Sequence, residues 1–159
     1  MTRRFTPIEL AIGASLLGCI AAIAIPTFTR EVHASRLVEP IDGLNRLGGA
    51  ALSLAEAGGR FPDSASLTPL VPPRGAKVVD PPGTWDAPTW RMLDFRASQE
   101  GVPHAFSFAF EGSSGSFVGQ AKGDLDGDGL FSTFEIRGAV VPGGKPALSP
   151  GMYIESELE

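Results

Sequence analysis

The stretch LAIGASLLGCIAAIAI, residues 10–25, decides how the first part of this chain folds. It carries no charge, and Glu9 stands at its entrance. A carboxylate is costly in lipid, so a chain that keeps one there usually has a partner for it. Two cations, Arg3 and Arg4, come just before the run, and a more polar body follows it. The composition predicts a helix that is buried in lipid or among other helices.

Two kinds of segment share this composition. A secretory signal peptide has a basic start, an apolar centre and a small-residue cleavage site, but Pro26, Thr27 and Phe28 stand where that site would be. A plain membrane anchor needs about 20 apolar residues to cross a ~30 Å hydrocarbon core. The run reaches that length if Ile8 and the residues through Phe28 contribute.

A third interpretation depends on FTPIEL, residues 5–10, and IAIP, residues 23–26. Together these two stretches resemble the N-terminal signature of type IV pilins and pseudopilins. The resemblance implies that a basic leader, residues 1–4, is cut between Arg4 and Phe5. It also implies that Glu9 pairs with the amine exposed on Phe5 during assembly, and that Pro26 interrupts the helix. An ion pair suits such a place, because either charge alone would be expensive there.

Two departures from the family pattern affect processing. Pro7 replaces the usual Leu, which the first turn of a helix tolerates. Arg4 replaces the usual Gly, so a long cation would have to fit where a peptidase normally meets no side chain. Whether the bond between Arg4 and Phe5 is cut therefore stays open.

The same resemblance implies partners and a location. The partners are identical or related pilin subunits, a prepilin peptidase and an assembly platform in the inner membrane. Positive charge before the apolar run predicts a single membrane pass with a cytoplasmic N-terminus. After assembly the subunit would be part of a periplasmic or cell-surface filament.

Helical periodicity continues beyond the apolar run. One apolar face is predicted by Leu37, Ile41, Leu44, Leu47, Ala51 and Leu54. Gly58 and Gly59 then provide a stop. We expect one helix over about residues 8–57, apolar all round in residues 5–28 and amphipathic in residues 29–58. Pro26 and Pro40 should kink it or melt it locally, and Gly43, Gly48 and Gly49 should weaken its second half. Small residues at Ala14, Gly18 and Ala22 would let neighbouring helices approach closely.

The remainder, residues 59–159, predicts a loop-rich domain of antiparallel strands. Residues 61–83 are rich in Pro and Gly and are expected to be mostly loop. Strands are expected at 105–110, 116–121, 130–136 and 152–154, with the Phe side of the first strand and Trp85, Trp90, Leu93 and Phe95 in the core. The predicted fold is α+β, with a long N-terminal, pilin-like helix packed on a small antiparallel sheet.

The acidic stretch GDLDGDG, residues 123–129, is the second motif. Carboxylates at Asp124, Asp126 and Asp128 alternate, and a Gly permits the sharp turn, so the stretch could bind Ca²⁺ through oxygen ligands. The spacing continues as in an EF-hand, with Ser132 and Glu135 at positions nine and twelve. Because the flanks predict strands, Glu135 would lie too far away to close the site. We therefore expect a β-hairpin with a structural calcium-binding turn; the alternative is a solvated Asp-Gly turn.

Other features limit the function classes. The net charge of −5 gives no electrostatic support for nucleic-acid binding. The single cysteine, Cys19, excludes an intrachain disulfide. His33 and His104 stand outside any catalytic spacing, so no enzyme activity is predicted. The sequence predicts a structural subunit of a type IV pilus or of a type II secretion-like pseudopilus. The alternative is a non-polymerising, single-span membrane protein with a calcium-binding extracytoplasmic domain.

Overall fold

The structure, a computed structural model, describes residues 6–141 and 143–156, and within residues 29–34 it describes only the backbone. The expected leader, with Arg4 and Phe5, lies outside the described residues. The chain divides into two compact units, residues 1–36 and 37–159. The long helix α1 (Pro7–Gly58) contributes to both units.

Helix α1 matches the predicted helix to within one residue at each end. Its 52 residues are helical without interruption, so the local melting predicted at Pro26 and Pro40 is wrong. A proline removes only one backbone donor, and other bonds can hold the turn. Near Pro26, the Thr27 hydroxyl donates to the carbonyl of Ile23 at 2.8 Å. Pro40 is fully buried in the core of the second unit.

The helix ends as its glycines predict. Gly59 has a φ of +74°, a conformation that side chains other than glycine's rarely adopt. Its N–H donates to the carbonyl of Ala55 at 2.8 Å. This left-handed residue satisfies one of the free carbonyls at the end of the helix and turns the chain toward the sheet.

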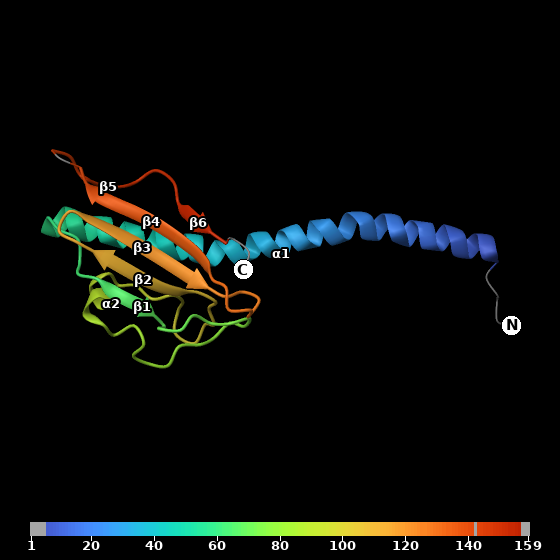
Figure 1. Ribbon diagram of the computed structural model, residues 1–159, viewed down its shortest axis with the longest axis horizontal. Helices are drawn as coiled ribbons and strands as arrows, with labels where there is room; N and C mark the ends of the chain where they lie inside the picture. Colours follow the sequence, from blue (N-terminus) through green and yellow to red (C-terminus); the bar gives the residue numbers. More distant parts are fainter. Residues whose placement is uncertain (1–5, 142, 157–159) are drawn as a thin grey trace. The chain divides into compact units, whose positions relative to one another are not determined.

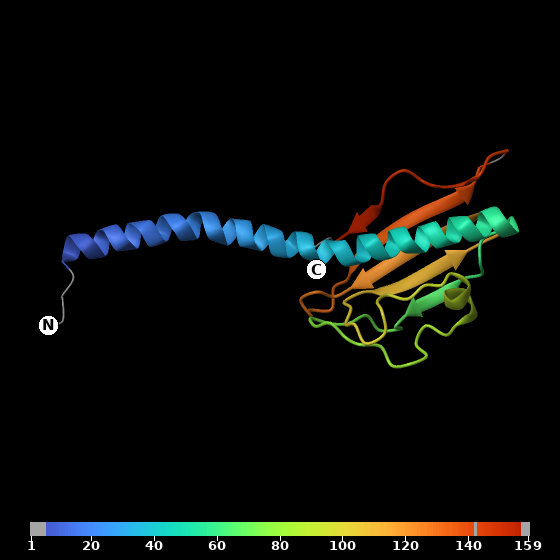
Figure 2. The ribbon, with the colours of Figure 1, turned by 180° about the vertical axis from the view of Figure 1, so that it is seen from behind.

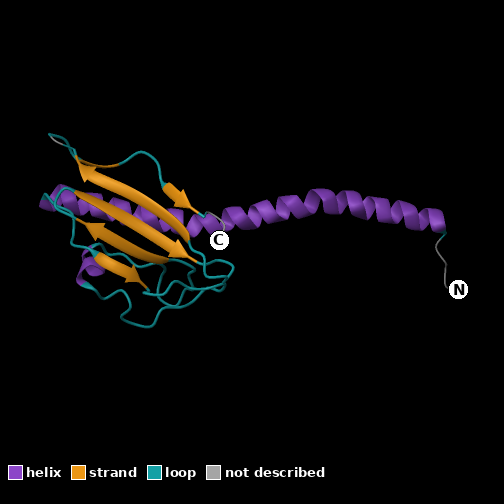
Figure 3. Ribbon diagram, viewed as in Figure 1, coloured by secondary structure: helices purple, strands orange, loops and turns teal. Residues whose placement is uncertain are grey.

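The second unit contains an antiparallel sheet of six strands in the order β1-β2-β3-β4-β5, with β6 also paired to β4 (Figures 1 and 3). A short helix, α2 (Pro88–Met92), lies in the connection between the first two strands. The strands are β1 (Ala65–Thr68), β2 (Ser107–Gly112), β3 (Ser116–Gly123), β4 (Ser132–Val140), β5 (Pro146–Leu148) and β6 (Tyr153–Glu155).

Residues 37–58 of α1 lie along one face of this sheet, as seen from behind in Figure 2. Register explains which side chains meet the helix: Phe108 pairs with Ala121, which pairs with Phe134, so all three lie on the same face. All three are fully buried. Leu44 and Leu47 of α1 belong to the same hydrophobic core and are also fully buried. The predicted Phe core and the predicted apolar face of the helix are both confirmed.

Two glycines bring the helix unusually close to the sheet. A Cβ on Gly43 would overlap the ring of Phe108, and one on Gly48 would lie 2.7 Å from Cδ1 of Ile136. A Cβ on Gly49 would meet nothing within 4 Å. Gly43 and Gly48 are therefore the points at which the helix backbone approaches the sheet. The sequence analysis expected them only to weaken the helix.

Residues 61–83 are mostly loop, as predicted, but the strand β1 lies within this segment and pairs with β2. Proline and glycine on both sides of this four-residue strand hid it. β5 and α2 were also missed, because neither segment shows a readable period over its three or five residues. Of the aromatic residues assigned to the core, Trp90 and Phe95 are buried and Trp85 packs against them half-buried.

Candidate functional site

The first candidate site is the N-terminus of α1. Thr6 precedes the helix, and its backbone N–H and hydroxyl both donate to Oε2 of Glu9, at 2.8 and 3.0 Å. In return, the N–H of Glu9 donates to the Thr6 hydroxyl oxygen at 3.3 Å. This reciprocal arrangement is a capping box, with Pro7 at the first helical position. Glu9 thus has a partner within its own chain, a role that the sequence analysis did not consider.

The helix that follows this cap is apolar and exposed. Residues Pro7–Phe28 form a 22-residue segment with a mean hydropathy of 2.2, and it is the one helix in the described chain long and apolar enough to cross a membrane. Large side chains on all sides are exposed, including Leu17, Ile23 and Phe28 at 70–73%. A signal sequence near an N-terminus has the same length and composition. The segment is therefore weakly compatible with a membrane anchor.

The predicted small-residue stripe lies on this exposed segment. Ala14, Gly18 and Ala22 are all exposed, and a Cβ added to Gly18 would meet nothing within 4 Å. Within one chain these positions are open, so another helix could approach the backbone closely here. A small-residue stripe also occurs in membrane anchors that pack against no other helix.

The acidic loop is the second candidate site. It connects β3 to β4 as a hairpin, as predicted, rather than connecting two helices. One carboxylate oxygen each from Asp124, Asp126 and Asp128 lies within 4.8 Å of the others. Three negative oxygens this close suit a hard cation such as Ca²⁺. Exposed acidic groups are also common without a metal, so the geometry is permissive.

The three aspartates differ in burial and in hydrogen bonding. The Asp124 side chain is fully buried, and its two oxygens accept the N–H groups of Gly127 at 2.7 Å and Gly129 at 3.1 Å. Asp126 and Asp128 are exposed, and each accepts the N–H two residues further on. Asp124 therefore organises the loop, while the other two orient their carboxylates through local turns.

Glu135, which an EF-hand would use to close the site, lies elsewhere. It is in β4 directly opposite Gln120, whose side-chain amide donates to Oε1 at 2.8 Å. Its other oxygen accepts from Arg137 at 3.2 Å. Three register positions separate it from the end of the hairpin, or about 10 Å at ~3.3 Å per residue. The expectation that Glu135 cannot join the aspartates agrees with this position.

A buried polar group that the sequence analysis did not predict lies near the loop-rich connection. Oδ2 of Asp80 accepts the indole N–H of Trp85 at 2.6 Å and lies 2.9 Å from Nε2 of His104. Nδ1 of the buried His104 ring lies 2.8 Å from the carbonyl of Phe106, to which it donates. His104 is thus a buried, hydrogen-bonded residue of the second unit. Asp80 gave no signal, because nothing in sequence spacing connects it to a histidine 24 positions away.

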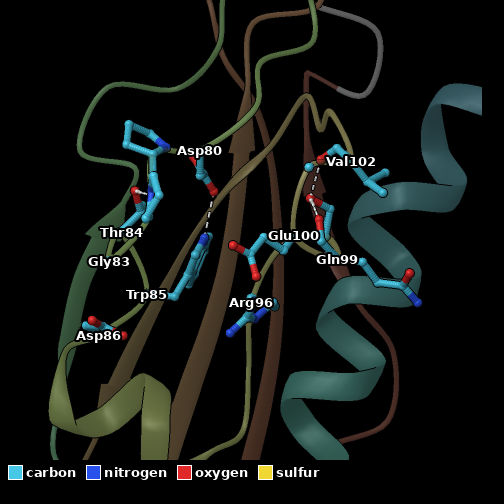
Figure 4. Close-up of a pocket in the computed structure, with 13 residues that line it drawn as sticks. Asp80, Gly83, Thr84, Trp85, Asp86, Arg96, Gln99, Glu100 and Val102 are labelled. Carbon is cyan, nitrogen blue, oxygen red and sulfur yellow. Dashed lines mark hydrogen bonds between the residues drawn. The ribbon is translucent and has the colours of Figure 1, made fainter.

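Asp80 and Trp85 also line a shallow cleft of about 230 Å³ between residues 80–86 and residues 96–102 (Figure 4). The cleft contains hydroxyl and carboxylate groups, but several already have partners. Thr84 donates to the carbonyl of Pro81 at 2.9 Å, Ser98 donates to the carbonyl of Val102 at 2.6 Å, and Asp86 pairs with Arg91 outside the cleft at 3.2 Å. These groups stabilise two turns.

Comparisons of this chain with protein-family models, with curated proteins and with solved structures found no match. Functional inference therefore depends on two local features: the capped, exposed apolar helix at Thr6–Phe28 and the acidic hairpin at Asp124–Gly129.

Proposed function

We propose that this protein is a structural subunit of a type IV pilus or of a type II secretion-like pseudopilus, which polymerises through its N-terminal helix. The observation that carries the proposal is the exposed apolar segment Pro7–Phe28, with one carboxylate, Glu9, in its first turn. Burial of a large apolar side chain is worth about 1.5–3 kcal/mol. A segment that exposes so many of them needs lipid, neighbouring helices or both.

The length of the helix favours a filament over a simple anchor. A ~30 Å hydrocarbon core takes about 20 helical residues, whereas α1 has 52. Its last part, from Leu37, already packs on the sheet. A helix of this length would let subunits leave the membrane and keep the apolar segments together in a filament core. Before assembly the subunit would be an inner-membrane protein, and its partners would be pilin subunits, the peptidase and the assembly platform.

In the proposed filament, Glu9 pairs with the amine of Phe5 on a neighbouring subunit. The proposal requires cleavage after Arg4, which would create that amine. The capping box does not prevent the pairing, because a carboxylate can accept up to about four hydrogen bonds. Both Thr6 donors approach Oε2, so among the described residues Oε1 is left for an incoming ammonium group.

The acidic hairpin would have a structural role in the same subunit. Calcium held by Asp124, Asp126 and Asp128 would stabilise the folded domain by mass action where calcium is abundant. Carboxylate, carbonyl and water oxygens are the ligands that calcium prefers. No enzymatic activity and no nucleic-acid partner form part of the proposal.

One observation favours the second candidate, a single-span membrane protein that does not polymerise. Thr6 already satisfies Glu9 within the chain, so the carboxylate has a local use even without a neighbour. Under this alternative the protein stays in the membrane as a monomer, with the same calcium-binding domain outside.

Variants at the capping box separate these candidates. Glu9→Gln keeps an oxygen that can cap the helix, since Gln also serves in a capping box, but it cannot form an ion pair. Glu9→Ala removes both functions. Thr6→Val removes the capping hydroxyl while keeping the charge and a similar shape. Sheared filaments and carbonate-resistant membrane insertion would be measured for each variant and for the parent.

For a filament subunit we expect Glu9→Gln and Glu9→Ala to lose filaments equally, with normal insertion, and Thr6→Val to keep them. Normal filaments from Glu9→Gln would overturn the ion-pair role. A parent that inserts but never crosslinks to another copy or to a related helix would favour the monomeric anchor. Intact mass of the purified protein adds an independent check: a mature chain that begins at Phe5 supports the filament subunit, and an uncut chain supports the anchor.

A further inference from the structure

Residues 74–80, here called the strap, connect the acidic hairpin to helix α1. At the hairpin end, the N–H of Gly75 donates to the carbonyl of Asp124 at 2.8 Å. Arg74 forms an isolated parallel bridge with Asp124, and its Nε lies 3.8 Å from Oδ2 of that residue. The strap therefore contacts both the backbone and the side chain of the residue that organises the loop.

Beside the Arg74–Asp124 ion pair, the two segments also meet backbone to backbone. A Cβ on Gly75 would lie 3.4 Å from the carbonyl oxygen of Asp126 and 3.5 Å from Cα of Gly127. No side chain of Gly75 or Gly127 separates the two segments, so a shift in one backbone cannot be absorbed by rotamer changes at these positions.

The other end of the strap is tied to α1 and to the start of β2. Nζ of Lys77 lies 3.2 Å from Oε2 of Glu39, and Oε1 of Glu39 accepts the N–H groups of Ala105 at 2.6 Å and Phe106 at 3.1 Å. Val78 exchanges two backbone hydrogen bonds with His104, both at 2.9 Å. One carboxylate from the helix thus joins the strap to the strand that carries the central Phe residues.

We propose that the strap is a conformational link, so that the acidic hairpin and the helix–strap contact at Glu39 open and close as one unit. The chain between the two ends is too short for independent motion. Gly75 and Lys77 are two residues apart, which span at most about 7 Å when fully extended. Movement of the hairpin away from its position therefore pulls on Lys77 and Val78, and release of Lys77 loosens Gly75.

Such a link is reciprocal. If ordering of the hairpin stabilises the contact at Glu39, ordering of that contact stabilises the hairpin by the same free energy. Native-state hydrogen exchange measures this directly, because amides in one cooperative unit exchange through the same opening. The link does not depend on filament formation, so it can fail while the proposed function stands.

Two matched variants test the two ends. Arg74→Gln removes the cation at the hairpin end, and Lys77→Gln removes the one at the helix end; both side chains are about 60% exposed, so the fold should survive. Arg91→Gln is the control, because the Arg91 side chain is similarly exposed, at 66%, and its ion pair with Asp86 lies outside the strap. Amide exchange would be measured by NMR on the full-length protein in detergent micelles.

A partly exposed ion pair contributes up to about 1 kcal/mol, or roughly fivefold in an opening equilibrium. We expect Arg74→Gln to speed exchange about two- to fivefold at Ala105 and Phe106, the far end of the link. Lys77→Gln should speed exchange by a similar factor at Gly127 and Gly129. The control should change neither set. If each variant affects only the amides beside it, the two ends open independently and the proposal is wrong.

Discussion

Replacing glycines in α1 by alanine tests how closely the helix packs on the sheet. Gly43, Gly48 and Gly49 lie within one helix in one chain, yet the space around them differs. A Cβ at Gly43 would enter the ring of Phe108, which is fully buried and has Cε1 only 2.6 Å from the added atom. At Gly49 it would enter open space.

The expected free-energy changes follow from two opposing terms. Alanine in place of glycine stabilises a helix interior by about 0.5–1 kcal/mol. Overpacking a filled core costs about 1–3 kcal/mol. Gly49→Ala should therefore stabilise the domain by about 0.5–1 kcal/mol, because only the first term applies. Gly43→Ala should destabilise it by about 0.5–2 kcal/mol, because both terms apply and the second is larger.

Gly48→Ala should fall between these two. Its added Cβ would meet Cδ1 of Ile136 at 2.7 Å and Cδ2 of Leu148 at 3.2 Å. Both contacts are the ends of flexible side chains. Leu148 is 39% exposed and can move aside, whereas the buried Ile136 must shift within the core, at a cost that offsets the gain in helix propensity. We expect a net change near zero.

Thermal unfolding of full-length protein in detergent measures all three variants. Both tryptophans of the chain, Trp85 and Trp90, belong to the second unit, so their fluorescence reports on that unit. At about 4 °C per kcal/mol, the midpoint should rise by roughly 2–4 °C for Gly49→Ala and fall by roughly 2–8 °C for Gly43→Ala. Equal shifts at Gly43 and Gly49 would refute close packing of this helix on Phe108.

Three further predictions concern the loop, the buried polar group and the last strand. Asp126→Asn keeps an oxygen for the local turn but removes one charge. It should therefore abolish most of the calcium-dependent rise in melting temperature. In the parent, a calcium concentration a hundredfold above Kd should stabilise the fold by about 2.7 kcal/mol. An unchanged rise would remove the calcium claim. Asp80→Ala leaves the indole N–H of Trp85 without its acceptor and should cost about 1–3 kcal/mol in chemical denaturation; a loss below 0.5 kcal/mol, by the same scale, would contradict it. The negative carboxylate of Glu155 raises the pKa of Tyr153, so Glu155→Gln should lower that pKa toward its ordinary value. Because Tyr153 is the one tyrosine in the sequence, phenolate absorbance reads the change directly.

The long-range features of α1 could be read from the sequence, because they repeat over many residues. An apolar face at three- and four-residue spacing identifies a helix whatever its neighbours are, and two glycines mark its end. The Phe-rich strand was visible for the same reason, since apolar and small residues alternate over the six positions 105–110. The boundaries moved by a few residues, because pairing with a neighbour extends a strand beyond its own pattern.

What could not be read depends on contacts between distant segments. β1 is a strand because β2 offers it an edge, and its own four residues lie among prolines and glycines. Pro40 stays helical within a packed core, which single-residue propensity does not describe. Asp80 and Glu39 give no local signal, because their partners lie 24 and 66 positions away. Topology alone brings such pairs together.

The acidic loop lies between these two cases. Alternating aspartates and glycines identified the turn, but the sequence did not distinguish the roles of the three carboxylates. Asp124 is buried and its oxygens accept two backbone N–H groups, which pre-orders the loop before any cation binds. A cation would therefore meet ligands already close together, and would gain affinity because less ordering is left to do. The same hydrogen bonds would hold the turn without a metal, so only a calcium-dependent measurement separates the two.

Glu9, near the N-terminus, also makes local hydrogen bonds that would form with or without a further partner. The sequence Thr6-Pro7-Ile8-Glu9 is sufficient to start a helix, and a negative charge in the first turn is favoured by the helix dipole in any protein. A capping box would tolerate glutamine at this position. What needs the charge itself is a positive partner in a medium of low dielectric constant, where an unpaired carboxylate would be expensive. Glutamine can keep the local hydrogen bonds, and losing the interaction of the charge with the helix dipole costs only about 0.3–1 kcal/mol. Complete loss of filaments in Glu9→Gln with normal membrane insertion would therefore report the contribution of a neighbouring subunit.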